Sequence, residues 1–355
     1  MLRRLRTSMG ILALVAVAIL LSACTFKGDT MTIDPGHSPE NKEIWGLYSI
    51  VWWLALMIFI LVEVALFYAI FRFRRRPGQG LPRQTHGNNR LEVAWTIAPA
   101  LLLVFVAIPT VRIIINQSAP AGPDAVHVRI IGHQFWWEAQ YLDYPDAQGN
   151  PLRTANEIHV PVGKEIEFQV TSADVQHSFW CPCSAARSML CRPASTTSST
   201  PHRRLIATFQ CAELCGTAHG FMKFYLVVDT QADFDTRLKG QQTAVQAATT
   251  DPIKQGEQLV TTLCAGCHYI QGTSAQGRVG PNLTGFGNRQ TMAAGWVPTT
   301  EENIKTWVHN PGDIKPGAVA DPSYSDFVNT MRMPAFNTLT DEQLTAIAKY
   351  LLSLK

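Results

Sequence analysis

Four side chains that bind soft metals lie close together in the sequence, at Cys211, Cys215, His219 and Met222. Thiolate, thioether and imidazole ligands together favour copper over magnesium, calcium or manganese, and two cysteines this close could bridge two metal ions. The spacing leaves two alternatives open, a structural zinc site, which does not need the methionine, and a disulfide between the cysteines. One more metal ligand must come from elsewhere in the chain, and we expect it to be His177.

A second chemical motif, Cys264-Ala-Gly-Cys267-His268, has the spacing of c-type haem attachment. In such a motif two thioethers anchor the porphyrin and the adjacent histidine binds the iron. A zinc site or a redox dithiol shares the short pattern, but an amphipathic run near the C-terminus favours a haem domain. Met333, which precedes a proline, resembles the sixth ligand of the class I cytochrome c family, with Met331 as the fallback.

Two apolar segments, 45–71 and 93–111, are long enough to span a bilayer, and only Glu63 interrupts the first. A cluster of arginines follows the first segment, so the positive-inside rule places the connecting loop in the cytoplasm and both chain ends in the periplasm. A carboxylate within a span is costly unless it faces another helix or water, and of these we expect a buried contact with protein for Glu63.

The first 23 residues have the pattern of a lipoprotein signal peptide, with a basic start and an apolar run too short to span a bilayer comfortably. The run ends in Leu21-Ser-Ala-Cys24, which resembles a bacterial lipobox. We expect cleavage before Cys24 and lipidation of its thiol. An ordinary signal peptide or an uncleaved anchor is the alternative.

The rest of the chain divides into two further domains. After a membrane segment at 24–115, residues 125–230 contain short alternating β-rich runs, which predict an antiparallel β-sandwich or barrel. Residues 231–251, rich in Gln, Ala and Thr, are expected to form a linker, and an all-α domain is predicted at 252–355. A net charge of +3 over 355 residues gives no sign of nucleic-acid binding.

The runs 170–180 and 210–222 resemble subunit II of cytochrome c oxidase. The resemblance implies a cupredoxin-like domain with a dinuclear copper A centre, and a magnesium ion that the Glu213 carboxylate reaches at the subunit I border. It also implies that electrons enter through the aromatic patch of Phe135, Trp136 and Trp137. The copper ligands that it implies are His177, Cys211, the Glu213 carbonyl, Cys215, His219 and Met222.

The order of lipobox, helical hairpin, copper domain and cytochrome domain resembles the caa-type oxidases, whose subunit II carries its own haem. This resemblance implies a multi-pass protein of the bacterial inner membrane, with its copper and haem domains in the periplasm. It would accept electrons from cytochrome c or another periplasmic donor. Haem c and copper A would pass them to subunit I, within a complex of further oxidase subunits that reduces oxygen to water and pumps protons. The alternatives are a membrane-anchored cytochrome c electron shuttle with a defective copper site and a non-catalytic assembly or copper-delivery protein.

The segment 181–209 departs from the family pattern, because it lacks strand alternation and adds Cys181, Cys183 and Cys191. In a shifted reading frame, each codon consists of the last base of one present codon and the first two bases of the next. In that frame the segment can encode residues that resemble those of the family at these positions. We therefore interpret the segment as a frameshift that is later compensated. We expect it to weaken copper assembly, and its thiols could form disulfides with the copper-ligand cysteines in an oxidising compartment.

Overall fold

The computed structural model describes residues 39–75, 77–78, 80, 84, 87–118, 120–181, 188–191, 205–317 and 332–355. The expected signal peptide and the lipidation site Cys24 lie outside the described residues, as do Cys183 and Met331. The interpretation of 181–209 as a frameshift can be compared with the structure only at 181, 188–191 and 205–209.

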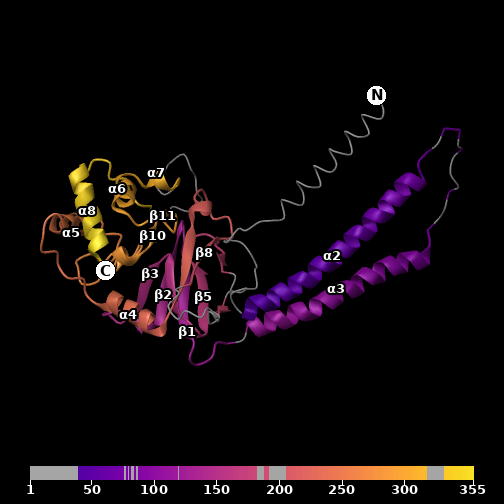
Figure 1. The fold of residues 1–355 in the computed structure, drawn as a ribbon, viewed down its shortest axis with the longest axis horizontal. Helices are drawn as coiled ribbons and strands as arrows, with labels where there is room; N and C mark the ends of the chain where they lie inside the picture. The colour runs from indigo at the N-terminus through magenta and orange to yellow at the C-terminus, as the bar shows by residue number, and fades with distance from the viewer. Residues whose placement is uncertain are drawn as a thin grey trace.

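Two long helices carry the apolar segments, α2 (Pro39–Arg72) and α3 (Asn89–Gln117), and both extend beyond the predicted spans. Asn88 caps α3, because its side chain accepts from the N–H groups of Arg90 and Leu91 at 3.1 and 3.4 Å. The helices lie side by side as a hairpin that projects away from the other domains (Figure 1). Both helices are long and apolar enough to cross a membrane, and no other described part of the chain covers their apolar windows.

Among the described residues, nine strands of the next domain form two sheets, which Figure 1 shows beside the hairpin. The first sheet has the order β3-β2-β1-β5-β7 and the second β4-β9-β8-β6. The first contains β1 (Val126–His133), β2 (Trp136–Pro145), β3 (Pro151–Ala155), β5 (Ile166–Ser172) and β7 (Ser188–Cys191). The second contains β4 (Glu157–Pro161), β6 (Phe179–Trp180), β8 (Leu205–Cys211) and β9 (Lys223–Asp229). The prediction of antiparallel sheets was wrong in part, because β1 pairs with β5 and β4 with β9 in parallel.

Alternating apolar residues of the two sheets make one core. On β1 the buried positions are every second residue, including Val128 and Ile130, and they meet Phe168, Trp137 and Phe224. Each such side chain contributes roughly 1.5–3 kcal/mol on burial. This packing confirms the predicted cupredoxin-like β-sandwich.

The expected linker 231–251 begins with a helix, α4 (Gln231–Gln242). Thr230 caps it by accepting from the N–H of Asp233 at 3.2 Å. Phe234 and Leu238, four residues apart on one face, are buried in the core of the β-domain. The composition of this stretch concealed the helix, because only two of its residues are buried.

The C-terminal domain is mainly helical, with α5 (Ile253–Leu263), α6 (Glu301–His309), α7 (Pro311–Ile314) and α8 (Asp341–Ser353). Short turns η1 (His219–Phe221) and η2 (Phe286–Asn288) occur in the β-domain and in this domain, respectively. The α5 helix packs so tightly on α8 that a Cβ at Gly256 would lie 2.1 Å from the carbonyl oxygen of Ala346. A small hairpin, β10 (Thr291–Met292) and β11 (Val297–Pro298), is an addition to the predicted all-α domain.

The segment around 181–209 contains strands that its composition did not predict. Ser188–Cys191 is an edge strand paired with β5, and β8 begins at Leu205 and pairs with β9. Backbone hydrogen bonds require no alternation of side chains, so the pairing survives an irregular sequence. Cys181 is disulfide-bonded, whereas Cys211 and Cys215 are free, so the disulfides that the segment could form with these two thiols are not present in this structure.

Candidate copper and haem sites

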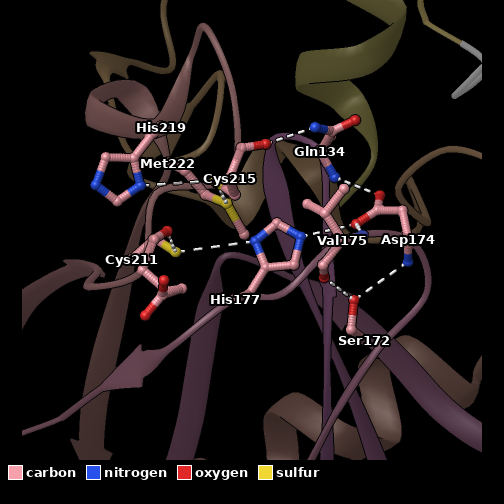
Figure 2. Close-up of polar contacts among 10 residues, drawn as sticks. Gln134, Ser172, Asp174, Val175, His177, Cys211, Cys215, His219 and Met222 are labelled. Carbon is pink, nitrogen blue, oxygen red and sulfur yellow. Dashed lines mark hydrogen bonds and ion pairs between the residues drawn. The ribbon is translucent and has the colours of Figure 1, made fainter. Parts of the chain in front are cut away.

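The sulfur and nitrogen atoms of the first motif converge at one end of the β-sandwich (Figure 2). Cys211 is the last residue of β8, and its Sγ lies 3.8 Å from Nδ1 of His177. Cys215 Sγ lies 3.6 Å from Nδ1 of His219 and 3.9 Å from Sδ of Met222. Both histidines therefore present the same ring nitrogen to a thiol.

The donor set fits a soft metal centre. Ligand atoms of His177, Cys211 and Cys215 all lie within 4.8 Å of one another. The carbonyl oxygen of Glu213 lies 3.2 Å from Cys211 Sγ, while the Glu213 side chain is exposed. Two thiols, two imidazoles and a thioether in a buried pocket suit copper better than a hard cation. The predicted magnesium contact of Glu213 stays a prediction.

The two thiols affect each other's protonation. A hydrogen bond from Cys215 lowers the pKa of Cys211 to about 3. In turn, hydrogen bonding and the charge of Cys211, together with burial, raise the pKa of Cys215. Cys211 is therefore the thiol that more readily becomes a thiolate, which is the form of cysteine that binds metals.

Asp174 orients His177, and sequence reasoning missed this role. Its Oδ1 lies 2.7 Å from Nε2 of His177, and its Oδ2 accepts from the backbone N–H of Gln134 at 2.7 Å. With Nε2–H donated to the carboxylate, Nδ1 remains as the lone-pair atom that faces Cys211. The side-chain amide of Gln134 in turn donates to the Cys215 carbonyl. The signal was present in the sequence, because Asp174 lies three residues before His177 in the run that carried the resemblance.

Gly132 leaves room for the His177 ring. A Cβ at this position would lie 2.7 Å from both Cδ2 and Cγ of the ring, closer than any real contact. The β1 strand can therefore approach the imidazole only where it has no side chain.

The second motif lines a cavity in the C-terminal domain. Cys264, Cys267, His268 and Met333 all face it, among mainly apolar side chains. Nδ1 of His268 donates to the carbonyl oxygen of Pro281 at 2.8 Å, which leaves Nε2 free to bind a metal. Burial lowers the pKa of His268, so its ring is neutral at pH 7. Thiols, a neutral imidazole and a thioether around an apolar cavity fit a covalently bound haem.

Comparison with known proteins agrees with this arrangement. Residues 26–113 match the family model for the transmembrane domain of cytochrome c oxidase subunit II, 126–230 match its periplasmic domain, and 253–355 match cytochrome c. Cytochrome c oxidase subunit 2 of Bacillus sp. strain PS3 is 31% identical over 80% of this chain and 80% of its own. That of Bacillus subtilis strain 168 is 30% identical over 97% of both chains.

The chain belongs to the cytochrome c oxidase subunit II family. It is therefore a component of the oxidase enzyme complex, anchored to the membrane, and it carries a cytochrome c domain. Within the family it resembles those members whose subunit II extends into a cytochrome, because the Bacillus subtilis relative covers both domains. The family that the sequence resembled and the predicted fold class are confirmed.

In this subunit II the three aromatic residues of the predicted patch have different surroundings. Trp137 is fully buried in the β-core, and its ring centroid lies 5.7 Å from that of His177. Trp136 stacks on His133, with centroids 4.2 Å apart. Phe135 is also buried, and together with Trp136 it lines the cavity of the cytochrome domain. Their part in electron transfer stays a prediction.

The copper and cytochrome domains of this subunit II share a bonded interface. The buried Glu157 carboxylate of β4 accepts from the N–H groups of Gln290 and Thr291 at 2.7 and 2.9 Å. On β9, the N–H of Lys223 donates to the carbonyl of Ala294 at 2.9 Å. Because a buried carboxylate without partners is costly, Glu157 stabilises this docked arrangement.

Proposed function

We propose that the protein is the electron-input subunit of an aerobic terminal oxidase. It would accept electrons from cytochrome c or another periplasmic donor and deliver them to subunit I, where oxygen is reduced to water with proton pumping. The cofactors proposed are haem c in the cytochrome domain, dinuclear copper A in the β-domain and a magnesium ion shared with subunit I. The partners are subunit I and the other oxidase subunits.

One observation carries this proposal. The cavity that contains Cys264 and His268 is closed on one side by Gln134, Phe135 and Trp136 of the copper domain. The same Gln134 donates its side-chain amide to the carbonyl of Cys215. A single short loop thus contacts both candidate redox sites, which suits two carriers that work in series.

The residues of each site have separate tasks. When bound, haem c and copper A would each accept and release one electron. His177, held by Asp174, and His219 present Nδ1, while the buried Cys211 and Cys215 supply thiolates. Fixed ligands change little between oxidation states, and this keeps the reorganisation on electron transfer small.

The membrane orientation belongs to the same proposal. The arginines after α2 place the connection between α2 and α3 on the cytoplasmic side. The β-domain follows the far end of α3, so it and the cytochrome domain would lie in the periplasm, where an external donor can reach them (Figure 1).

Spectra of the purified full-length protein test the proposal. We expect both a haem c absorption and the absorption and electron spin resonance signals of copper A. Cys215→Ser should abolish the copper signals, retain the haem and stop oxygen uptake driven by reduced cytochrome c in the assembled oxidase. A haem signal without copper A in the unmodified protein would refute the proposal and favour the membrane-anchored cytochrome shuttle.

A further inference from the structure

Three cationic side chains line the haem-type cavity, Arg289, Lys315 and Arg332. Among the described residues, no aspartate or glutamate lines it. A mainly apolar cavity with cations and no carboxylate among its described lining residues is suited to a ligand that has an apolar body and an anionic edge.

Lys315 is the most deeply buried of these cations. Only 3% of its surface is exposed, and its ammonium donates to the backbone carbonyl of Phe135 in the copper domain. The short helix α7 positions it, because the Lys315 N–H bonds to the carbonyl of Pro311 at 3.0 Å. The side chain therefore extends from the cytochrome domain across the interface to the aromatic loop.

The ammonium has no ion-pair partner among the residues that the structure describes. Burial lowers the pKa of Lys315 from its ordinary value of 10.5 to about 7. A carbonyl takes up one of its three N–H groups, and a buried cation needs an anion to be stable. The charge of Cys215 also acts on the Lys315 ammonium, and the cavity that Lys315 lines is a further place from which a partner anion can come.

We propose that the Lys315 ammonium pairs with a propionate carboxylate of the haem while it donates to the Phe135 carbonyl. Lys315 is then a positioning residue that joins the cofactor, the cytochrome domain and the aromatic loop of the copper domain. Haem binding completes the interface, and the docked domains in turn hold the haem edge in one place. This inference rests on the haem c assignment above.

Substitutions in the full-length, haem-loaded protein in detergent test the pairing. Lys315→Met removes both charge and donor, Lys315→Gln keeps a neutral donor for Phe135, and Lys315→Arg keeps the charge. Lys254→Met, at an exposed position on α5, is the matched control for loss of one lysine. The readouts are covalent haem staining, the haem reduction potential and the rate of electron transfer from haem to copper.

All variants should retain covalent haem. Lys315→Met and Lys315→Gln should lower the haem potential, because removal of a positive charge beside the haem disfavours the added electron. They should also slow electron transfer from haem to copper about tenfold or more, because a small displacement of the haem edge from the copper site is enough to lower the rate by that factor. Lys315→Arg and the Lys254→Met control should stay close to the unmodified protein.

Two results in haem-bearing variants would overturn the pairing. One is a Lys315→Gln potential equal to that of the unmodified protein, which would leave Lys315 as a neutral donor only. The other is a shift in Lys315→Arg as large as that in Lys315→Met. Absence of covalent haem from the unmodified protein would overturn the haem assignment and the pairing with it.

Discussion

Replacing Asp174 should weaken copper binding without removing any copper ligand. Its carboxylate receives N–H groups of Gln134, Val175 and His177, each at 2.7 Å, and only 7% of its side chain is exposed. Loss of a buried charged acceptor costs roughly 1–3 kcal/mol. Loss of the partner that orients a metal-binding histidine commonly costs about 10- to 100-fold in affinity.

Two substitutions separate these effects. Asp174→Asn keeps the shape of the side chain but turns one acceptor oxygen into a donor that faces another donor, and we expect copper affinity to fall about tenfold. Asp174→Ala removes every acceptor, and we expect a loss of about 100-fold. Both values follow from the contacts of one carboxylate, since Cys211 and Cys215 remain in place.

The assay is copper competition against a chelator, with the full-length haem-loaded protein in detergent and the copper A absorption as readout. Asp143→Asn is the matched control, because Asp143 contacts Nδ1 of His127 at 3.1 Å but is 43% exposed. Exposed pairs of this kind contribute about 0–1 kcal/mol, so its copper affinity should not change. An affinity of Asp174→Ala equal to that of the control would refute the orienting role.

Three further predictions follow from the packing and the protonation of single residues. Gly132→Ala should destabilise the copper domain by about 1–3 kcal/mol and displace the His177 ring, which denaturant unfolding and copper titration would detect; unchanged copper loading would contradict this. Although burial raises the pKa of Glu138, hydrogen bonds from neighbouring side chains lower it to about 2. The ionised Glu138 carboxylate therefore stabilises the folded protein by up to about 3 kcal/mol above pH 4.5, and this contribution is lost as the pH falls through 2. The unfolding free energies of the native protein and of Glu138→Gln should converge between pH 4.5 and 2. Met333→His should keep covalent haem and lower its potential, because the thioether is lost; an unchanged potential would assign the sixth ligand elsewhere.

The sequence was sufficient for the ligand motifs because their chemistry is local. Cys211, Cys215, His219 and Met222 follow one another closely at the end of β8 and in the turn after it, so their spacing alone brought them into one site. The haem attachment motif is local in the same way. Length and hydropathy likewise predicted both long apolar helices, since a bilayer imposes a length that composition reveals directly.

Side-chain pattern was less informative where a few contacts decide the structure. The α4 helix forms within a stretch that resembles a linker because Phe234 and Leu238 find the β-core. The Ser188–Cys191 strand forms in an irregular segment because backbone pairing with β5 is available. Neither outcome can be read from composition, since each depends on a surface supplied by another part of the chain.

Only the tertiary structure decided which residues support the two redox sites. The Lys315 ammonium and the Phe135 carbonyl meet although they are 180 positions apart. Gln134 bonds to Cys215 across 81 positions. A lysine or a glutamine has no distinctive spacing, and its role arises when packing of two domains buries it beside a partner. Ligand identity is thus a property of local sequence, whereas the orientation of ligands and the docking of the domains follow from long-range contacts.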